Sequence, residues 1–226
     1  MAKQLDLEEQ EQLDQLKHFW RQHGDWISWT LIIVFGSIAG WNAFQYWQRN
    51  QSMQAAGLYD EVERAAQAAD LSKLEQAFAD MKSRYAGTAY AQQTGLLVAS
   101  SLAEKGELER AKAALSWVSE QASDDGYKAV ARLRLAGLLA ETKAYDEALK
   151  QLDAITLKEF LPLVADRRGD IHALSGNPAK ARDEYQRAYA GLQDAGQYRR
   201  LVEVKLNALG VQPEPQDKPT TTEAKK

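Results

Sequence analysis

One uncharged apolar stretch sets the limits on how this chain can fold. Residues 26–48 read WISWTLIIVFGSIAGWNAFQYWQ without a single charge, between Asp25 and Arg49. As a helix that rises about 1.5 Å per residue, the stretch would extend roughly 33 Å, which matches a bilayer hydrocarbon core of about 30 Å. Tryptophans stand near both of its ends, where the headgroup region favours amphipathic rings. The sequence therefore predicts one transmembrane helix over residues 26–48.

Two other interpretations of this stretch fit the sequence less well. A buried core helix of a globular protein seldom runs this far without a charge. A cleavable signal peptide needs a basic start and a small-residue cleavage site, whereas residues 1–14 are acidic. We therefore expect an uncleaved anchor that sits in a lipid bilayer.

Basic residues beside the stretch indicate its orientation. Lys17 and Arg21 precede it closely, whereas only Arg49 follows it closely. Lys and Arg accumulate on the cytoplasmic side of membrane helices. We expect residues 1–25 to form a cytoplasmic N-terminal segment and the rest of the chain to be translocated, into the periplasm in a Gram-negative host.

Small residues inside the stretch suggest a helix-packing face. Gly36 and Gly40 are four residues apart, and Ala39 and Ala43 repeat that spacing. Such a face lets another membrane helix approach closely, although glycine is also common in membrane helices that pack against nothing. Gly36 and Gly40 are predicted to contribute to membrane helix packing, and the alternative stays open.

Beyond Arg49 the apolar residues recur at helical spacing, and three segments align as an internal repeat. Equivalent positions hold small residues in the first helix of each pair, small residues and then larger ones in the second helix, and turn residues between the two. These positions are Ala99, Ala136 and Gly169; Ala111, Ala148 and Ala181; Leu115, Leu152 and Tyr185; and Gly106, Lys143 and Gly176. The spacing brackets the 34 residues of a tetratricopeptide repeat.

The flanking segments complete the predicted fold. Gln51 to Tyr85 indicates a further helix pair broken near Asp70, and Gln197 to Leu209 indicates a closing helix. We expect an all-α fold: one N-terminal transmembrane helix, then a tetratricopeptide-repeat-like α-solenoid over residues 49–210. Residues 211–226 contain three prolines among polar residues and are expected to be disordered.

Several function classes are excluded by composition. The chain has no cysteine, only three histidines and a net charge of -4, so we expect no metal, no cofactor and no nucleic-acid partner. Asp166 and Asp170 lie one helical turn apart, a spacing that suits a catalytic acid and base, but no nucleophile accompanies them. We expect them to be solvated charges of a repeat helix and the protein not to be an enzyme.

A repeat stack offers a concave face built from its first helices, and such faces commonly bind polypeptide. Counting along the repeat places six candidate partner-binding residues there: Leu96, Val130, Leu133, Leu163, Asp166 and Asp170. Most are apolar, which suits a hydrophobic segment of a partner. The competing interpretation is that the leucines are core residues, displaced here by an error of register.

Two groups of residues resemble a known family. The entry to the span contains Leu16–Trp20 and His23–Gly24, and the repeats contain Leu133–Ala136, Ala148–Lys150 and Val164–Asp166. In these positions the chain resembles the YfgM family, the ancillary subunit of the SecYEG translocon of Gram-negative bacteria. The extension after Gly210 departs from that pattern.

The resemblance implies an inner-membrane protein with a cytoplasmic N-terminus and a periplasmic repeat domain. Its implied partners are the SecYEG translocon and the periplasmic chaperone PpiD, and its implied role is to help transfer secreted proteins to periplasmic chaperones without catalysis. The alternative is a cytoplasm-facing, membrane-anchored tetratricopeptide scaffold that regulates envelope assembly. The sequence does not indicate whether the chain dimerises.

Overall fold

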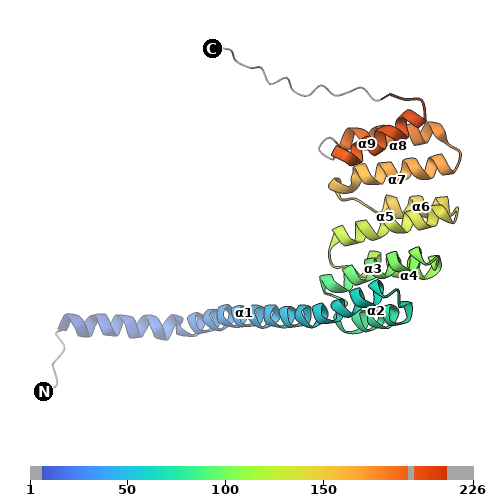
Figure 1. Ribbon diagram of the computed structural model, residues 1–226. Coiled ribbons are helices and arrows are strands. Elements are labelled where there is room, and N and C mark those ends of the chain that lie inside the picture. Colours follow the sequence, from blue (N-terminus) through green and yellow to red (C-terminus); the bar gives the residue numbers. More distant parts are fainter. Residues whose placement is uncertain (1–6, 193–195, 213–226) are drawn as a thin grey trace, which may run out of the picture. The chain divides into compact units, whose positions relative to one another are not determined.

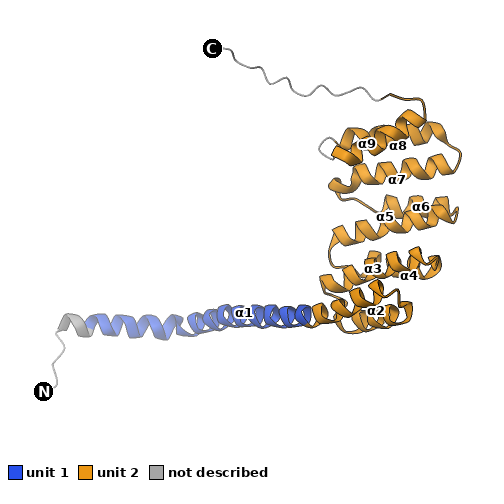
Figure 2. Cartoon of the chain, viewed as in Figure 1, with its two compact units in different colours: residues 1–53 blue, residues 54–226 orange. Residues whose placement is uncertain are grey.

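The computed structural model describes residues 7–192 and 196–212, and over these ranges the chain is helical with no strand. It divides into two compact units, Met1–Met53 and Gln54–Lys226 (Figure 2). The predicted all-α class is confirmed. Most of the tail for which we expected disorder, residues 213–226, lies outside the described residues.

The predicted span lies within one long helix, α1, which runs from Leu7 to Gln67. It is long and apolar enough to cross a membrane, and none of its most apolar window is buried inside the protein. The hydroxyls of Thr30 and Ser37 donate to the carbonyls of Trp26 and Ile33, at 2.8 and 2.7 Å. Because hydrocarbon offers hydroxyls no partner, satisfying them within the helix suits a membrane segment.

The remaining helices pair into hairpins that succeed one another in chain order (Figure 1). Their bounds are α2 Leu71–Tyr85, α3 Ala89–Glu104, α4 Leu108–Gln121, α5 Asp125–Glu141, α6 Tyr145–Asp153, α7 Leu161–Leu174, α8 Pro178–Gly191 and α9 Gly196–Ala208, with a 3-10 turn at Lys158–Phe160. The closing helix predicted over residues 197–209 corresponds to α9. The predicted break near Asp70 is also confirmed, because the Asp70 carboxylate accepts a hydrogen bond from the backbone N–H of Lys73 and caps α2.

The repeat register inferred from the sequence is confirmed by burial. Ala99, Ala136 and Gly169 are buried in the first helices, and the six aligned residues of the second helices are all at most 4% exposed. The three turn residues share a left-handed backbone, with φ of +79° at Gly106, +62° at Lys143 and +78° at Gly176. Glycine adopts this conformation without strain, whereas Lys143 adopts it at a cost.

In the hairpin of α7 and α8, the aligned packing positions hold different side chains from those of the other repeats. A Cβ atom added to Gly169 would lie 2.4 Å from the ring of Tyr185. The equivalent pairs in the two preceding hairpins combine alanine with leucine. Gly169 is therefore required where the larger ring of Tyr185 replaces leucine.

A fourth copy of the register, which the sequence alignment missed, lies in the hairpin of α1 and α2. Its turn residue, Ala69, has φ +52°, and Val62, Leu74 and Phe78 stand at the spacings found in the other hairpins. All three side chains are at most 5% exposed. The stack thus comprises four hairpins and α9 within the described residues.

The buried side chains form one main core from the first hairpin to α7, a smaller core at the C-terminal end, and a small cluster of Ala55, Met81 and Ala91 from α1, α2 and α3. Consecutive hairpins join where the second helix of one packs on the first helix of the next, as α2 does on α3 and α4 does on α5. The ring of Phe78 in α2 also meets that of Trp117 in α4 edge to face, 5.4 Å between centroids. Each hairpin therefore buries its apolar side against its neighbour, as a repeat that cannot fold alone must.

Candidate functional site

The predicted partner-binding residues lie on one side of α3, α5 and α7, called here the first-helix face and defined by Leu96, Val130, Leu133, Leu163, Asp166 and Asp170. Their four apolar side chains are half-buried. Leu96 and Leu133 pack against the main core, and Leu163 packs against the smaller one. Each contributes to a core and also exposes part of its surface. A role in partner binding stays a prediction.

Polar contacts link neighbouring helices beside this face. The guanidinium of Arg134 in α5 donates to the backbone carbonyl of Leu96 in α3, at 3.3 Å. The Gln93 side-chain amide of α3 donates to the Tyr127 hydroxyl of α5, at 2.7 Å. These contacts fix the spacing between α3 and α5, so the apolar residues of the face are held by rigid helices.

Our expectation that the two aspartates are solvated is wrong for Asp166. This residue is 3% exposed, because α9 packs over this part of α7. Its carboxylate accepts hydrogen bonds from the Tyr198 hydroxyl, at 2.6 Å, and from the Lys205 ammonium, at 2.8 Å. A buried carboxylate requires such partners, because unpaired it would lose its hydration without compensation.

Asp170 completes the same cluster. It accepts from Lys205, at 2.7 Å, and from the Tyr185 hydroxyl of α8, at 2.8 Å, and it also faces the guanidinium of Arg167. Lys205 therefore bridges both aspartates. We call Asp166, Asp170, Tyr185, Tyr198 and Lys205 the α9 cluster.

The electrostatics of the α9 cluster suit a structural role. Burial raises the pKa of both tyrosines above their ordinary value, and hydrogen bonds to Asp170 and Asp166 raise the pKa further. Both phenols therefore stay protonated donors at neutral pH. Both phenols and the Lys205 ammonium donate to the two carboxylates, so the cluster clamps α7, α8 and α9 together.

The sequence reasoning missed Tyr198 and Lys205 as partners of the aspartates. They lie on the closing helix, and Lys205 is 39 residues from Asp166 in the chain. No local spacing indicates a contact over that separation. The one available signal was a lysine on a helix expected to cover the end of the stack.

It also missed the most exposed apolar side chains at the end of the stack. Leu174 at the end of α7 is 61% exposed, and Leu201 and Val204 of α9 are 49% and 63% exposed. A terminal helix that only shields the stack would present a polar outer surface. These side chains are therefore further candidates for contact with a partner.

In the membrane helix, Gly36 and Gly40 leave an open surface. No atom outside the local helix backbone lies within 4 Å of a Cβ built at either position. That geometry permits close approach by another helix, while the predicted packing itself stays a prediction. Over residues 7–192 and 196–212, no group of three or more His, Asp or Glu side chains could hold a metal ion.

This chain is similar both to a described protein family and to individual proteins of known name. Residues 17–211 match the family described as "Tetratricopeptide repeat-like domain". The chain is 29% identical over 204 residues to a protein of Neisseria gonorrhoeae, and 28% identical over 211 residues to one of Escherichia coli K12 and over 206 residues to one of Haemophilus influenzae. Each alignment covers 90% of this chain and 97–98% of the relative.

All three relatives carry the name "Ancillary SecYEG translocon subunit". The resemblance that the sequence motifs indicated is thereby confirmed. Because each alignment covers 90% of this chain, it includes the apolar stretch at residues 26–48 and most of the repeats. Together with the one candidate span found in residues 7–192 and 196–212, this fits a single-pass inner-membrane protein.

Proposed function

As this chain belongs to the family of tetratricopeptide repeat-like domains, we propose that it is a non-enzymatic, membrane-anchored adaptor associated with the SecYEG translocon. The observation that carries the proposal is the joint occurrence, in one chain, of an apolar span and a helical repeat domain that align over 90% of the chain with proteins named ancillary translocon subunits. A repeat surface and an anchor suffice for such a role, and no catalytic group is required.

The proposed topology places residues 1–25 in the cytoplasm, residues 26–48 in the inner membrane and residues 49–210 in the periplasm. Lys17 and Arg21 on one side of the span and Arg49 on the other support this orientation. Alkaline phosphatase fused after Gly210 would then be active in cells. Activity of a cytoplasmic reporter at the same position would favour the alternative, a cytoplasm-facing scaffold that regulates envelope assembly.

The proposed task is to receive secreted chains at the translocon and help transfer them to periplasmic chaperones, PpiD among them. Newly translocated chains expose apolar segments before they fold, and these are the segments that half-buried leucines and valines are suited to contact. On this view Leu96, Val130, Leu133 and Leu163 contact the client. Asp166 and Asp170 hold α9 in place and shape the face.

Site-specific photocrosslinking in living cells tests this proposal. A photocrosslinker at Leu133 should trap secreted chains or chaperones, whereas one at Gly40 should trap membrane helices of the translocon. Ala113, an exposed residue of the second helix α4, is a matched control position that should trap neither. Equal capture of one partner at Leu133 and Gly40 would contradict separate roles for the face and the anchor.

Substitutions on the face sharpen the same test. Leu133→Glu and Leu163→Glu should reduce client crosslinking, because a carboxylate opposes burial of an apolar segment. Circular dichroism must show that each variant keeps its helical fold. If both variants folded and captured clients as the parent does, the first-helix face would not be the binding surface.

A further inference from the structure

The last turns of α1 and the helices α3, α5, α7 and α9 share one side of the stack, which includes the first-helix face. One row across it stands nine residues before each left-handed turn residue and consists of Asp60, Leu97, Arg134, Arg167 and Leu201. Gly210 supplies the fifth turn residue, with φ of +76° and the same backbone hydrogen bonds that Gly106 and its successor make. Helix α9 thus follows the register as the first helix of a fifth repeat.

Contacts between neighbouring first helices show that this row crosses the stack in chain order. The rings of Tyr59 in α1 and Tyr90 in α3 lie 5.7 Å apart. The guanidinium of Arg134 donates to α3, and that of Arg167 lies 3.7 Å from a Cβ built on Gly137 in α5. The α9 cluster joins α7 to α9. Neighbouring first helices are therefore side by side, with about 8–10 Å between packed helix axes.

The exposed charges on this side change sign along the stack. The cations are Arg134 of α5, Arg167 of α7 and Arg200 of α9, whereas the carboxylates are Asp60 and Glu63 of α1 and Glu104 of α3. Glu141, at the end of α5, stands between the two groups. Among the described residues, the one ion pair that any of these side chains makes joins Arg167 to Asp170, at 3.6 Å. The side is therefore cationic toward α9 and anionic toward α1.

The C-terminal segment carries its charges in the complementary order. Residues 213–226 read PEPQDKPTTTEAKK and lie beyond the family match, which ends at residue 211. Glu214 and Asp217 come first, and three lysines against one carboxylate follow. A segment that runs from α9 toward α1 therefore brings carboxylates to the arginines and lysines to the carboxylates.

The segment is also long enough to cross the stack. An extended proline-rich chain advances about 3.1 Å per residue, so Asp217 can stand about 22 Å from Gly210, and Lys225 about 46 Å. At the usual spacing of packed helices, α5 lies about 20 Å from α9, and α1 lies about 40 Å away. Proline favours an extended chain, which lowers the entropy cost of laying the segment along a surface.

We propose that residues 213–226 lie across this side of their own chain and occlude the first-helix face. Glu214 and Asp217 pair with the arginines of α5, α7 and α9, and the last lysines pair with the carboxylates of α1 and α3. Each exposed pair contributes little alone, but the tether keeps the segment at a high local concentration. A client must then displace the segment, a consequence that rests on the proposed function of the face.

Introduced cysteines report on this contact, because the chain has none of its own. Ser100→Cys places a thiol at an exposed position of α3 on the first-helix side, and Ala224→Cys places one beside the last lysines. In lipid nanodiscs at low salt, the intramolecular disulfide should form roughly two- to five-fold faster than in the control pair Ala113→Cys and Ala224→Cys. Ala113 is exposed on α4, the second helix of the same hairpin. At about 1 M salt, where the Debye length is about 3 Å, the difference should vanish.

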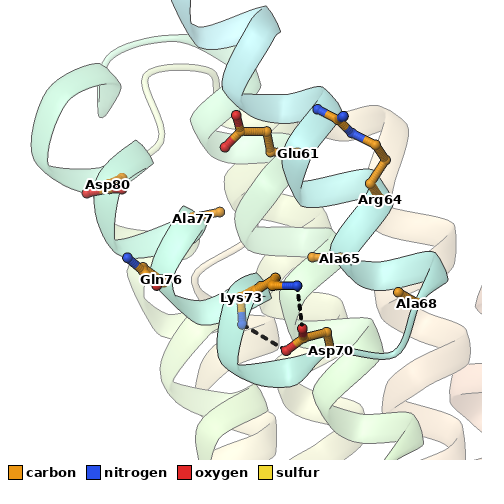
Figure 3. A pocket seen from close by; sticks show the side chains of 9 residues that line it. All are labelled: Glu61, Arg64, Ala65, Ala68, Asp70, Lys73, Gln76, Ala77 and Asp80. Carbon is orange, nitrogen blue, oxygen red and sulfur yellow. Dashed lines mark hydrogen bonds and ion pairs between the residues drawn. The ribbon is translucent and has the colours of Figure 1, made fainter.

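A hollow on the first hairpin offers a rival location for the segment. It lies between the last turns of α1 and helix α2 and has a volume of about 550 Å³ (Figure 3). Its lining mixes three carboxylates with two cations, and Lys73 already pairs with Asp70 at 3.2 Å. Ala68→Cys, in that lining, should couple to Ala224→Cys no faster than Ala113→Cys does. Faster coupling at Ala68 than at Ser100, or equal coupling at Ser100 and Ala113, would overturn the proposal.

A charge exchange tests the assigned order of charges. Arg134→Glu should slow formation of the disulfide between Ser100→Cys and Ala224→Cys roughly two- to five-fold, and adding Asp217→Lys should restore it. Lys180→Glu, at an exposed position of α8, is the matched control and should keep the parental rate. Circular dichroism checks that each variant keeps its helical content. Without rescue by Asp217→Lys, the pairing of the segment with α5 is refuted.

Occlusion is measured without any client. Deletion of residues 213–226 should speed alkylation of Ser100→Cys by a maleimide coupled to polyethylene glycol roughly two- to five-fold, because exposed ion pairs hold the segment weakly. The rate at Ala113→Cys should be the same with and without the segment. Equal rates at Ser100→Cys would show that the face is open in the full chain.

Two further outcomes separate this proposal from its neighbours. Disulfide-linked dimers in place of the intramolecular product would assign the site to the segment of a second copy and overturn the proposal. Client capture at Leu133 is measured in its own assay. If the segment docks but no client is captured, the proposed function fails while the docking of residues 213–226 stands.

Discussion

The hairpins α3–α6 and the C-terminal elements α7–α9 follow one register but are stabilised by different interactions. In α3–α6, alanines face leucines, and the buried sites contain almost no charge. In α7–α9, glycine faces tyrosine, the apolar core is small, and a buried carboxylate binds a lysine. Apolar packing tolerates small shifts, whereas the α9 cluster demands one geometry. The C-terminal end is therefore the part of the stack most sensitive to single substitutions.

Removal of the bridging Lys205 ammonium should give the largest difference in stability between α7–α9 and α3–α6. Lys205→Met leaves Asp166 buried without its counter-charge, and breaking a buried pair in this way costs about 3 kcal/mol. Hydrogen exchange should rise in α9 and the end of α7 but stay at parental values in α3–α6. Lys180→Met, at an exposed position of α8, is the control. Parental exchange in α9 of Lys205→Met would show that the cluster does not hold it.

Substitutions in the Gly169–Tyr185 pair should have the next largest effect on the free energy of unfolding. Gly169→Ala drives a methyl group against the Tyr185 ring, where overpacking costs about 1–3 kcal/mol. Tyr185→Leu recreates the pair found in α3–α6 but also removes the hydrogen bond from Tyr185 to Asp170, so the comparison is made within that background: Gly169→Ala should cost little in the Tyr185→Leu chain in urea unfolding. Gly137→Ala is the control, because its nearest side chain lies 3.7 Å away. If Gly169→Ala cost as much in the Tyr185→Leu chain as in the parent, the two pairs would not be equivalent.

Substitutions at the left-handed turn residues between paired helices should have smaller effects on the free energy of unfolding. Lys143 holds the left-handed conformation that Gly106 and Gly176 hold in the neighbouring hairpins. Lys143→Gly should raise the free energy of unfolding by about 0.5–1 kcal/mol, because glycine has no Cβ to clash in this conformation. Gly106→Ala should lower it by a similar amount. A loss of stability in Lys143→Gly would mean that the lysine side chain contributes more than its strain removes.

The contrast between the two regions also explains what the sequence revealed. Register, turns and helix bounds were predictable for the aligned repeats, because a periodic pattern of small and apolar residues determines them locally. The first hairpin escaped alignment because Val62 and Leu74 are large where its successors hold small residues. The α9 cluster escaped because a contact between residues 39 apart has no periodic signature. The repeat spacing predicts which residues belong to the first-helix face, but it does not predict the exposed fraction of each side chain.

Alkaline pH should also separate the two regions. The pKa of Tyr185 and of Tyr198 is raised in the folded chain above the ordinary value of 10.0, first by burial and then by hydrogen bonds to Asp170 and Asp166. Above about pH 10 the unfolded chain therefore releases these two protons before the folded chain does, which favours unfolding. Their contribution to stability is complete below pH 10 and declines as the pH rises.

The measurement is the urea midpoint of the full chain in detergent between about pH 9 and 11.5, compared with that of the double variant Tyr185→Phe and Tyr198→Phe. The variant should be less stable at pH 9, because it loses both hydroxyl donors, and should lose stability less steeply above pH 10. Tyr145→Phe, which removes a hydroxyl that donates only to a backbone carbonyl, should keep the parental slope. Parallel slopes for parent and double variant would show that the two phenols titrate normally and that the aspartates of the α9 cluster depend on Lys205 alone.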